Sequence, residues 1–504
     1  MFRSPRAVMT YGAVVLTALG IALAPGLEAA DSSVVVRGSD YRVEISAKVL
    51  NSSAARDLLG VHSLWWGHDE GLFVAGTTST RPEVVDFLSA AGGILRYGGG
   101  ANEISWRACS GDPSSRPKVK AAAWAGPMQC RFGIDQYLDL ITRSGGKSSW
   151  FIANIAGIDY VPMSDETVAS EAAAFAVAVR DDAPGLRRFW ELGNELERGR
   201  YGWPPEKLGE RARVAGAAIL KADKAAQLIV PLIEFNHPNQ PRRSVFNQRV
   251  LDSISVPVAG FAMHLYYDGR HGGPSIPTQL NTISETAEQV KNSRHKAAGL
   301  WITEHGRWPA GDTTEPEWRN RWSQTNDMDG VISTADFLIG LSQIPGVAGA
   351  MLHGLRTGPW NVVDTEGGDI RLTGVGQLLS LFGTSGAEVR LLSRTTSRNQ
   401  SEYVGGYDVR ASAFEGQDRQ HLVVWVANRS PAPAPMTLTS ELLVRLDAEP
   451  QGRSLVCVRP PQDCRTRDFR IVPLNQAQVM ANDGHLQITL PARSVSVLRL
   501  ERVK

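Results

Sequence analysis

The sequence has almost no charge imbalance, few cysteines and, beyond its first thirty residues, no long apolar run. Lys and Arg total 53, and Asp and Glu total 52, among 504 residues. This balance excludes the basic footprint of proteins that bind nucleic acid or anionic membranes, although a local basic groove could still hold a polyanionic substrate. No later segment reaches the roughly 20 apolar residues of a membrane span. We therefore expect no nucleic-acid partner and no span in the mature chain, while the oligomeric state is not predicted.

The four cysteines carry no metal-binding signature. Cys109 and Cys130 lie 21 residues apart, Cys457 and Cys464 lie 7 apart, and neither a CxxC motif nor a zinc-finger histidine accompanies them. We predict no metal and no cofactor. An even number of cysteines in an exported chain suggests two local disulfides, with four free thiols as the alternative. Proximity in sequence favours Cys109 with Cys130 and Cys457 with Cys464.

The first thirty residues have the pattern of a signal peptide. Arg3 and Arg6 give a positive start, Ala13–Ala24 is almost wholly apolar, and Ala29 and Ala30 supply small residues at a cleavage point. A membrane anchor is the alternative, but a run of about twelve residues is short for a span. The segment 1–30 thus predicts a secreted or periplasmic protein with a bacterial-type signal.

Between residues 50 and 386, short apolar runs alternate with helical patterns, which is typical of βα units around a parallel sheet. Eight strands are predicted, at Leu59–Gly67, Ile94–Gly98, Ser149–Ala156, Arg188–Leu192, Leu228–Phe235, Val258–Tyr266, Leu300–Glu304 and Val347–Leu355. Helices are predicted between them, at Pro82–Ala91, Ile134–Ile141, Ser164–Arg180, Glu206–Ala226, Gln279–Asn292 and Ile332–Ile344. This number of units predicts an α/β fold, a (β/α)8 TIM barrel. An open doubly wound sheet is disfavoured because no Gly-x-Gly-x-x-Gly turn follows the first strand.

After residue 386 the pattern changes to alternation of apolar and polar residues. The segments EVRLLS, YDVRASAF, HLVVWVAN, MTLTSELL and HLQITL are separated by turn residues, and Ser33–Val49 alternates as well. Such alternation predicts an antiparallel β-sandwich. We expect it to comprise residues 387–504 together with the N-terminal strand or strands of residues 31–49.

Two predicted barrel strands end in glutamates. The fourth ends in Trp190-Glu-Leu-Gly-Asn-Glu195 and the seventh in Trp301-Ile-Thr-Glu304. Function in such barrels sits at the carboxyl ends of the strands, and the fourth and seventh strands lie roughly opposite each other. Cleavage of a glycosidic bond needs two facing carboxyl groups, one as acid and one as nucleophile or base. Glu195 and Glu304 are therefore the candidate catalytic pair, and two unrelated surface glutamates are the alternative.

These stretches, together with Leu95-Arg96-Tyr97-Gly98-Gly99 and His264-Leu265-Tyr266, resemble the clan of retaining barrel hydrolases whose catalytic glutamates lie on strands four and seven. The chain looks most like the α-L-arabinofuranosidases of glycoside hydrolase family 51, with the xyloside- and glucuronide-cleaving families 39 and 79 as neighbours. The resemblance implies an exo-acting arabinofuranosidase-like enzyme on an oligo- or polysaccharide. An endo-acting polysaccharide hydrolase, a β-xylosidase or β-glucuronidase relative and a non-catalytic carbohydrate-binding protein are the alternatives.

The resemblance also implies residue roles. Glu195 would be the acid/base and Glu304 the nucleophile. The other implied contacts are Asn194 and Asn102 to the sugar, Tyr266 to the nucleophile, and Arg96 beneath it. His264 is weighed as a structural hydrogen-bonder or a site residue. Trp106 and Trp360 are candidate sugar platforms, because aromatic faces stack on sugars, but core packing is the alternative for each.

Overall fold

The computed structural model describes residues 41–501, except residues 52, 65–71, 75–76, 100–103, 121–126, 159–160, 200, 238, 268–273, 357, 366–367, 398–406, 417–418, 444–450, 475–478 and 483–484. The signal segment 1–30, the first part of the predicted strand Ser33–Val49, and Asn102 lie outside the described residues. Within these ranges, no helix combines the length and apolarity needed to cross a membrane.

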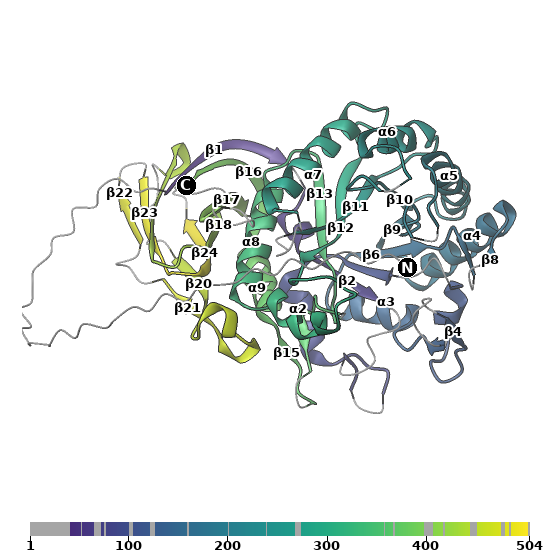
Figure 1. Cartoon of the computed structure of the whole chain (residues 1–504), viewed down its shortest axis with the longest axis horizontal. Coiled ribbons are helices and arrows are strands. Elements are labelled where there is room, and N and C mark those ends of the chain that lie inside the picture. Colours follow the sequence, from purple (N-terminus) through teal and green to yellow (C-terminus); the bar gives the residue numbers. More distant parts are fainter. Residues whose placement is uncertain are drawn as a thin grey trace, which may run out of the picture. The chain divides into compact units, whose positions relative to one another are not determined.

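Eight parallel strands close into a barrel, as the sequence predicts (Figure 1). In chain order they are β2 (Gly60–Leu64), β3 (Leu95–Gly99), β6 (Ser148–Ala153), β9 (Arg187–Leu192), β10 (Gln227–Pro231), β11 (Gly260–Tyr267), β12 (Gly299–Arg307) and β13 (Val347–Leu352). All eight predicted strands are present. Their residues are almost all buried, as expected for a parallel sheet covered on both faces.

Helices follow the barrel strands and pack around them (Figure 1). They are α2 (Pro82–Ala91), α3 (Ile134–Arg143), α4 (Asp165–Asp182), α5 (Pro205–Ala222), α6 (Arg243–Ser253), α7 (Ile276–Lys291), α8 (Met328–Ser342) and α9 (Gly374–Gly383). Ser164 is the N-cap of α4, as the sequence suggests, because its hydroxyl accepts a hydrogen bond from the Thr167 amide at 3.2 Å. The helices α6 and α9 were not predicted.

Large apolar side chains fill the lower part of the barrel interior. Trp150, Phe189 and Trp301 pack against one another with ring centroids 4.7–5.4 Å apart. They form one cluster with Ile94, Ile229, Ala262 and Met351, so seven of the barrel strands or their immediate flanks contribute. The filled interior makes the barrel a packed core, and leaves only its carboxyl end for polar side chains.

Ten of the other strands form one sheet in the order β21-β20-β24-β18-β17-β16-β1-β19-β23-β22. The bounds are β1 (Tyr41–Asn51), β16 (Ala387–Thr396), β17 (Val409–Gly416), β18 (His421–Asn428), β19 (Ala434–Ser440), β20 (Gln451–Cys457), β21 (Phe469–Pro473), β22 (Val479–Asn482), β23 (His485–Leu490) and β24 (Ser494–Glu501). The wholly antiparallel arrangement that the sequence suggests is wrong at one place. The strand β1 pairs antiparallel with β16 and parallel with β19, because it is inserted between two strands of opposite direction.

The two faces of this sheet bury different sets of side chains. In β18, Leu422, Val424 and Val426 belong to a hydrophobic core that the sheet domain forms by itself. The other strands that contribute to this core include β1, β16, β17, β19, β23 and β24. The alternate residues Val423 and Trp425 pack instead with the barrel's helices. Trp425 stacks on Phe382 of α9 with centroids 4.1 Å apart. The sheet therefore encloses one core and shares a second with the barrel.

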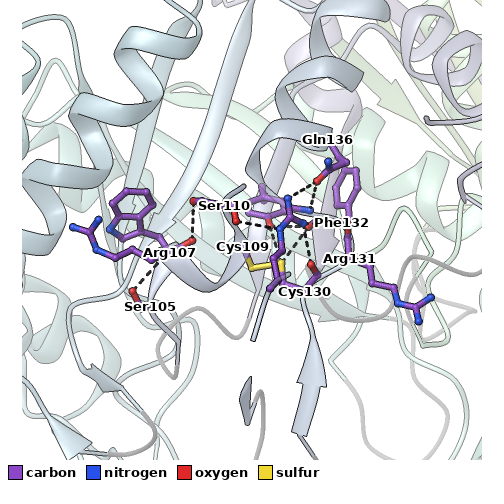
Figure 2. Close-up of a disulfide and its surroundings, with 12 residues drawn as sticks. Ser105, Arg107, Cys109, Ser110, Cys130, Arg131, Phe132 and Gln136 are labelled. Carbon is purple, nitrogen blue, oxygen red and sulfur yellow. Dashed lines mark hydrogen bonds between the residues drawn. A yellow bond between two sulfur atoms is a disulfide. The ribbon is translucent and has the colours of Figure 1, made fainter. Parts of the chain in front are cut away.

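Both predicted disulfides are formed. Cys109 pairs with Cys130 and Cys457 pairs with Cys464. Figure 2 shows the first pair with Phe132 and Gln136 beside it. Tyr97 of β3 donates a hydrogen bond to the Phe132 carbonyl at 2.7 Å. The disulfide therefore closes the long connection between β3 and α3 on itself, and the Tyr97 hydrogen bond holds that connection against the strand that carries Arg96.

Candidate active site

Glu195 lies three residues beyond the end of β9, in a tight turn. Gly193 has φ 92° and Glu195 itself has φ 52°, in the left-handed region that non-glycine residues rarely adopt. Backbone strain of this kind costs free energy and is concentrated at functional sites. The turn holds the Glu195 carboxyl at the mouth of the barrel, where 32% of its side chain remains exposed.

A bulge in β12 presents Glu304. Met263 of β11 pairs with Ile302, but the next residue, His264, pairs with Glu304, so Thr303 is an extra residue. The Thr303 hydroxyl reaches Glu191 at 3.3 Å, while Glu304 reaches Arg96 at 2.7 Å. Consecutive strand residues normally point to opposite faces, so the bulge is what turns both of these side chains inward.

Glu304 is buried and held by donors on both carboxylate oxygens. Arg96 Nη1 donates to Oε1 at 2.7 Å, and the Tyr266 hydroxyl donates to Oε2 at 3.0 Å. His264 Nδ1 lies 3.5 Å from Oε2. Burial alone would raise the pKa of Glu304, but His264, with His353 and His62 beside it, holds that pKa well below its usual range. Glu304 is therefore an anion at neutral pH.

Arg96 links Glu304 to a second buried carboxylate, Glu191 of β9. Its Nε and Nη2 donate to the two oxygens of Glu191 at 2.7 and 2.9 Å, and Nη2 also donates to Asn194 Oδ1 at 2.7 Å. Trp150 Nε1 donates to Glu191 at 2.8 Å. Burial opposes ionisation of Glu191, yet Arg96 lowers its pKa to about 2. One guanidinium thus compensates two carboxylates inside the barrel.

Glu195 is bridged to His264 and Arg198. His264 Nδ1 lies 2.8 Å from Glu195 Oε1, and Arg198 Nη1 lies 3.3 Å from the same oxygen. Burial would lower the pKa of His264, but Glu304, Glu191 and Glu195 together raise it to about 10. Burial would raise the pKa of Glu195, yet Arg198 and His264 lower it. The pair of Glu195 and His264 therefore keeps one proton across the neutral range.

A pocket of about 590 Å³ opens above these groups. It is lined by Glu195, Arg198, Glu234, Phe235, His264, Tyr266, Pro274, Gln279, Glu304, Trp308, Gly311, Asp312, His353 and Trp360. Tyr266 and Trp308 pack on Trp360 with ring centroids 4.6 and 5.3 Å away, forming one aromatic wall. A pocket with two carboxyls at its floor and an aromatic wall is suited to a small polar ring such as a sugar.

The structure gathers most of the predicted site residues around this pocket. Five of them contact the two glutamates, the hydrogen-bond partners of these glutamates, or the pocket wall: Arg96, His264, Tyr266, Asn194 and Trp360. Trp106 is placed elsewhere, stacked on Phe175 at 5.1 Å beside a separate cavity of about 40 Å³.

Several pocket residues were missed from the sequence. His62 and His353 lie 3.2 and 3.3 Å from the Glu304 carboxylate. Burial lowers the pKa of His62 to about 3, so it contacts Glu304 as a neutral ring. The sequence did contain a signal for a second interior carboxylate, because Glu191 is a single charged residue within the apolar run of the predicted fourth strand. Glu234 and Phe235 close the predicted fifth strand, so their place at a strand end was the available signal, although β10 ends at Pro231 and both lie in the loop that follows. Arg198 comes from the loop after β9 and had no such signal.

Among the residues that the structure describes, three groups of acidic and histidine side chains have atoms close enough to share a cation. They are His62, Glu304 and His353; Glu195, His264 and Glu304; and Glu197, Glu234 and His237, each with ligand atoms within 4.8 Å. Protein cations already contact each group. Arg96 contacts Glu304, and Arg198 contacts Glu195, Glu197 and Glu234 at 3.3, 2.6 and 2.7 Å. A metal ion would have to compete with a guanidinium at each place.

Fold and site together define a (β/α)8 barrel with an attached β-sheet domain and two opposed carboxylates at its mouth. No protein-family model matches the chain, and no curated protein matches it in sequence. Among solved structures, the chain is similar to an α-L-arabinofuranosidase of family 51 from Bifidobacterium longum, with a TM-score of 0.74 and 17% identity. That likeness covers 92% of this chain and 100% of the other.

Two further structures extend the comparison. A family 51 arabinofuranosidase from Xanthomonas axonopodis pv. citri has a TM-score of 0.72 and 18% identity, over 92% of this chain and 99% of the other. A bifunctional glucanase-xylanase from a metagenome library has a TM-score of 0.60 and 13% identity, over 92% and 99%. At these identities the shared property is the fold. This fold of a barrel with an attached β-sheet domain is also the one that the resemblance of the sequence motifs implies.

Proposed function

We propose that the chain is a retaining glycoside hydrolase, with α-L-arabinofuranosides as the expected substrates. The observation that carries the proposal is the pairing of Glu195 and Glu304. Oxygens of the two carboxylates lie within 4.8 Å of each other and face one pocket. Carboxyl groups about 5–5.5 Å apart favour the retaining route, because inversion needs room for a water molecule between them.

In the first step, Glu304 attacks the anomeric carbon and the bond to the leaving oxygen breaks. The Glu195–His264 pair supplies the proton that this oxygen takes. In the second step, Glu195 removes a proton from water, the water oxygen attacks the anomeric carbon, and Glu304 is released as a carboxylate. Arg96 and Tyr266 keep Glu304 ionised and oriented between turnovers.

The sugar assignment has two supports. The motifs around Arg96, Glu195 and Tyr266 resemble those of family 51, and two of the similar structures described above are arabinofuranosidases by name. We further propose that the enzyme is secreted or periplasmic, which is consistent with two disulfides in an oxidising compartment.

The test is hydrolysis of a panel of chromogenic aryl glycosides by the mature protein. The panel contains the α-L-arabinofuranoside, β-xyloside, β-glucuronide and β-glucoside of 4-nitrophenol. We expect turnover of the arabinofuranoside, with retention of anomeric configuration when the first-formed product is observed by NMR. The Glu304→Gln variant should lose at least about 10³-fold in kcat, since it lacks the nucleophile. Glu83→Gln, at an exposed glutamate of α2, is the matched control.

Each outcome has a distinct meaning. Full activity of Glu304→Gln would contradict the assignment of the nucleophile. Turnover of a different panel member, lost in Glu304→Gln, would keep the mechanism and change the sugar. Inversion of configuration would contradict the two-step route. Release of oligosaccharides from a polymer, without turnover of any aryl glycoside, would favour an endo-acting hydrolase. Sugar binding with no turnover at all would favour the binding-only alternative.

A further inference from the structure

Phe235 is a large apolar side chain that the protein leaves exposed at the pocket. It follows β10, and 49% of its surface is accessible, whereas most other phenylalanines in the described residues are buried. It lines the same pocket as the two glutamates. A single exposed apolar residue is common on a protein surface, but this ring lines a concave pocket beside two carboxyl groups, which is the setting in which aromatic side chains contact a ligand.

The Phe235 ring is held in position by its neighbours. The His237 ring lies 4.0 Å away with 35° between the planes, and the Arg198 guanidinium lies 5.4 Å from the Phe235 centroid. Glu234, buried next to it, accepts hydrogen bonds from Arg198 Nη2 on both oxygens at 2.7 and 2.9 Å. The loop after β10 therefore presents a fixed aromatic face beside a carboxylate and a guanidinium.

This group lies on the Glu195 side of the pocket. β9 and β10 are neighbours in the barrel, and Arg198 bridges the two loops because its Nη1 lies 3.3 Å from Glu195. Glu304 lies on β12 and is surrounded by Arg96, Tyr266 and His353 instead. In a retaining glycosidase the acid/base carboxyl lies at the leaving oxygen, so groups beyond it face the leaving group.

We propose that Phe235, Glu234 and Arg198 form a leaving-group subsite that binds a second, uncharged sugar unit. This inference rests on the proposed function. The apolar face of a pyranose or furanose ring stacks on Phe235, while its hydroxyls donate to Glu234 and accept from Arg198. We propose an uncharged unit because Arg198, the arginine that the described residues place in this subsite, already shares its positive charge among Glu195, Glu197 and Glu234.

The test compares two substrates with the same glycone and different leaving groups. For an arabinofuranosidase these are methyl α-L-arabinofuranoside and α-1,5-L-arabinobiose; for another sugar, the corresponding methyl glycoside and disaccharide. Both leaving groups are alkoxides that need protonation, but only the disaccharide fills the subsite. In Phe235→Ala we expect kcat/KM to fall about 10-fold for the disaccharide, and to change less than about twofold for the methyl glycoside. Phe235→Tyr, which keeps the ring, should restore the disaccharide rate.

Val245→Ala, at an exposed apolar residue of α6 outside the pocket, is the control and should affect neither substrate. Equal losses on both substrates in Phe235→Ala would overturn the subsite, because they would show a general effect on folding or on Glu195. No loss on either would overturn it as well. These outcomes require an active unsubstituted protein. Absence of turnover by that protein on every glycoside would instead overturn the proposed function.

Discussion

At the scale of single residues, the active site depends on one buried cation. Arg96 is fully buried and serves both Glu191 and Glu304. Its position on the second barrel strand lets it reach carboxylates on the fourth and seventh. Because an uncompensated charge in a low-dielectric interior is costly, the three side chains form an electrostatic unit, and changing one must alter the others.

The variant Glu191→Gln tests this unit. It leaves Arg96 with one carboxylate, and we expect a loss of about 3 kcal/mol in unfolding free energy at pH 7. A depressed folded-state pKa contributes stability that is present above the unfolded value of about 4.3 and is lost as pH falls toward 2. The variant should therefore lose stability less steeply than the wild type below about pH 4.3. Urea unfolding at several pH values measures this, and parallel curves would contradict the prediction.

A second residue-scale prediction concerns His264 and the pH profile. Glu195 and His264 share one proton, and the pair loses it only when His264 titrates near pH 10. A minor fraction of the pairs carries this proton on Glu195, so the acid form of Glu195 stays available above the ordinary pKa of a glutamate. In His264→Gln that proton is lost at the pKa of Glu195 alone. We expect the alkaline limb of kcat/KM to move down by about 2 pH units or more.

The measurement is kcat/KM for an aryl glycoside from pH 3 to 11 in both proteins. Tyr267→Phe is a suitable control, because Tyr267 follows the site residue Tyr266 on β11 but its hydroxyl faces His305, away from the carboxyl pair. An alkaline limb that stays in place in His264→Gln would show that His264 does not hold the proton.

The sequence allowed prediction of the residues at strand ends, because strand order alone brings them together. Glu195 and Glu304 were predicted in this way, whereas the resemblance of the sequence motifs implied Arg96, His264 and Tyr266. The sequence did not single out His353 or Phe235, although the predicted strands Val347–Leu355 and Leu228–Phe235 contain them, because the observed strands end earlier, at Leu352 and Pro231. Their positions depend on how each loop turns after its strand, and that is set by contacts between loops that no local pattern encodes.

At the scale of elements, the barrel strands were predictable because each is a near-continuous apolar run between helices. The helix α9 was missed because it is short, rich in glycine and buried on nearly all sides, so it shows no polar face. The helix α6 was missed because its buried residues include Asn247, whose side chain bonds the Ile233 backbone. The bulge at Thr303 has no sequence signature, because both a regular and a bulged β12 fit the same apolar run.

The two disulfides give an element-scale prediction. Loop-closure entropy makes the 21-residue link between Cys109 and Cys130 worth about 3.3 kcal/mol, and the 7-residue link between Cys457 and Cys464 about 2.4 kcal/mol. Replacing both cysteines of a pair by serine should therefore destabilise the protein more at the first pair. The first pair also ties the connection after β3, so its loss should lower activity, whereas loss of the second should not.

Guanidinium unfolding and kcat/KM on the aryl glycoside check both points. Equal stability losses would contradict the loop-length argument. Unchanged activity without the Cys109–Cys130 bond would show that hydrogen bonds such as those of Tyr97 to Phe132 and of Arg116 to Cys130 hold the connection after β3 in place without the disulfide.

At the scale of the whole molecule, the sheet domain is part of the barrel's support. Arg390 of β16 is fully buried and donates to the carbonyls of Val347 and Ala348 at 2.7 and 3.1 Å, where β13 begins. Phe382 and Trp425 stack across the same boundary. Since the sheet's second face is apolar, removing the sheet would expose the helices α8 and α9 to water. We therefore expect the barrel and the sheet to unfold as one cooperative unit.

Asp336 of α8 offers the sharpest test of this coupling. It is buried, and it pairs with Arg410 at 2.5 Å and Arg429 at 3.2 Å, both from the sheet. Asp336→Asn leaves two guanidinium groups without their counter-charge, so we expect a loss of about 3–5 kcal/mol. Asp329→Asn on the same helix is the matched control, because its pair with Arg493 is partly exposed and should cost no more than about 1 kcal/mol. In the control, the unfolding transition reported by a probe in the barrel should coincide with the transition reported by a probe in the sheet. Equal losses in the two variants would contradict the coupling, since they would mean that the buried pairs between the domains add nothing beyond a surface pair.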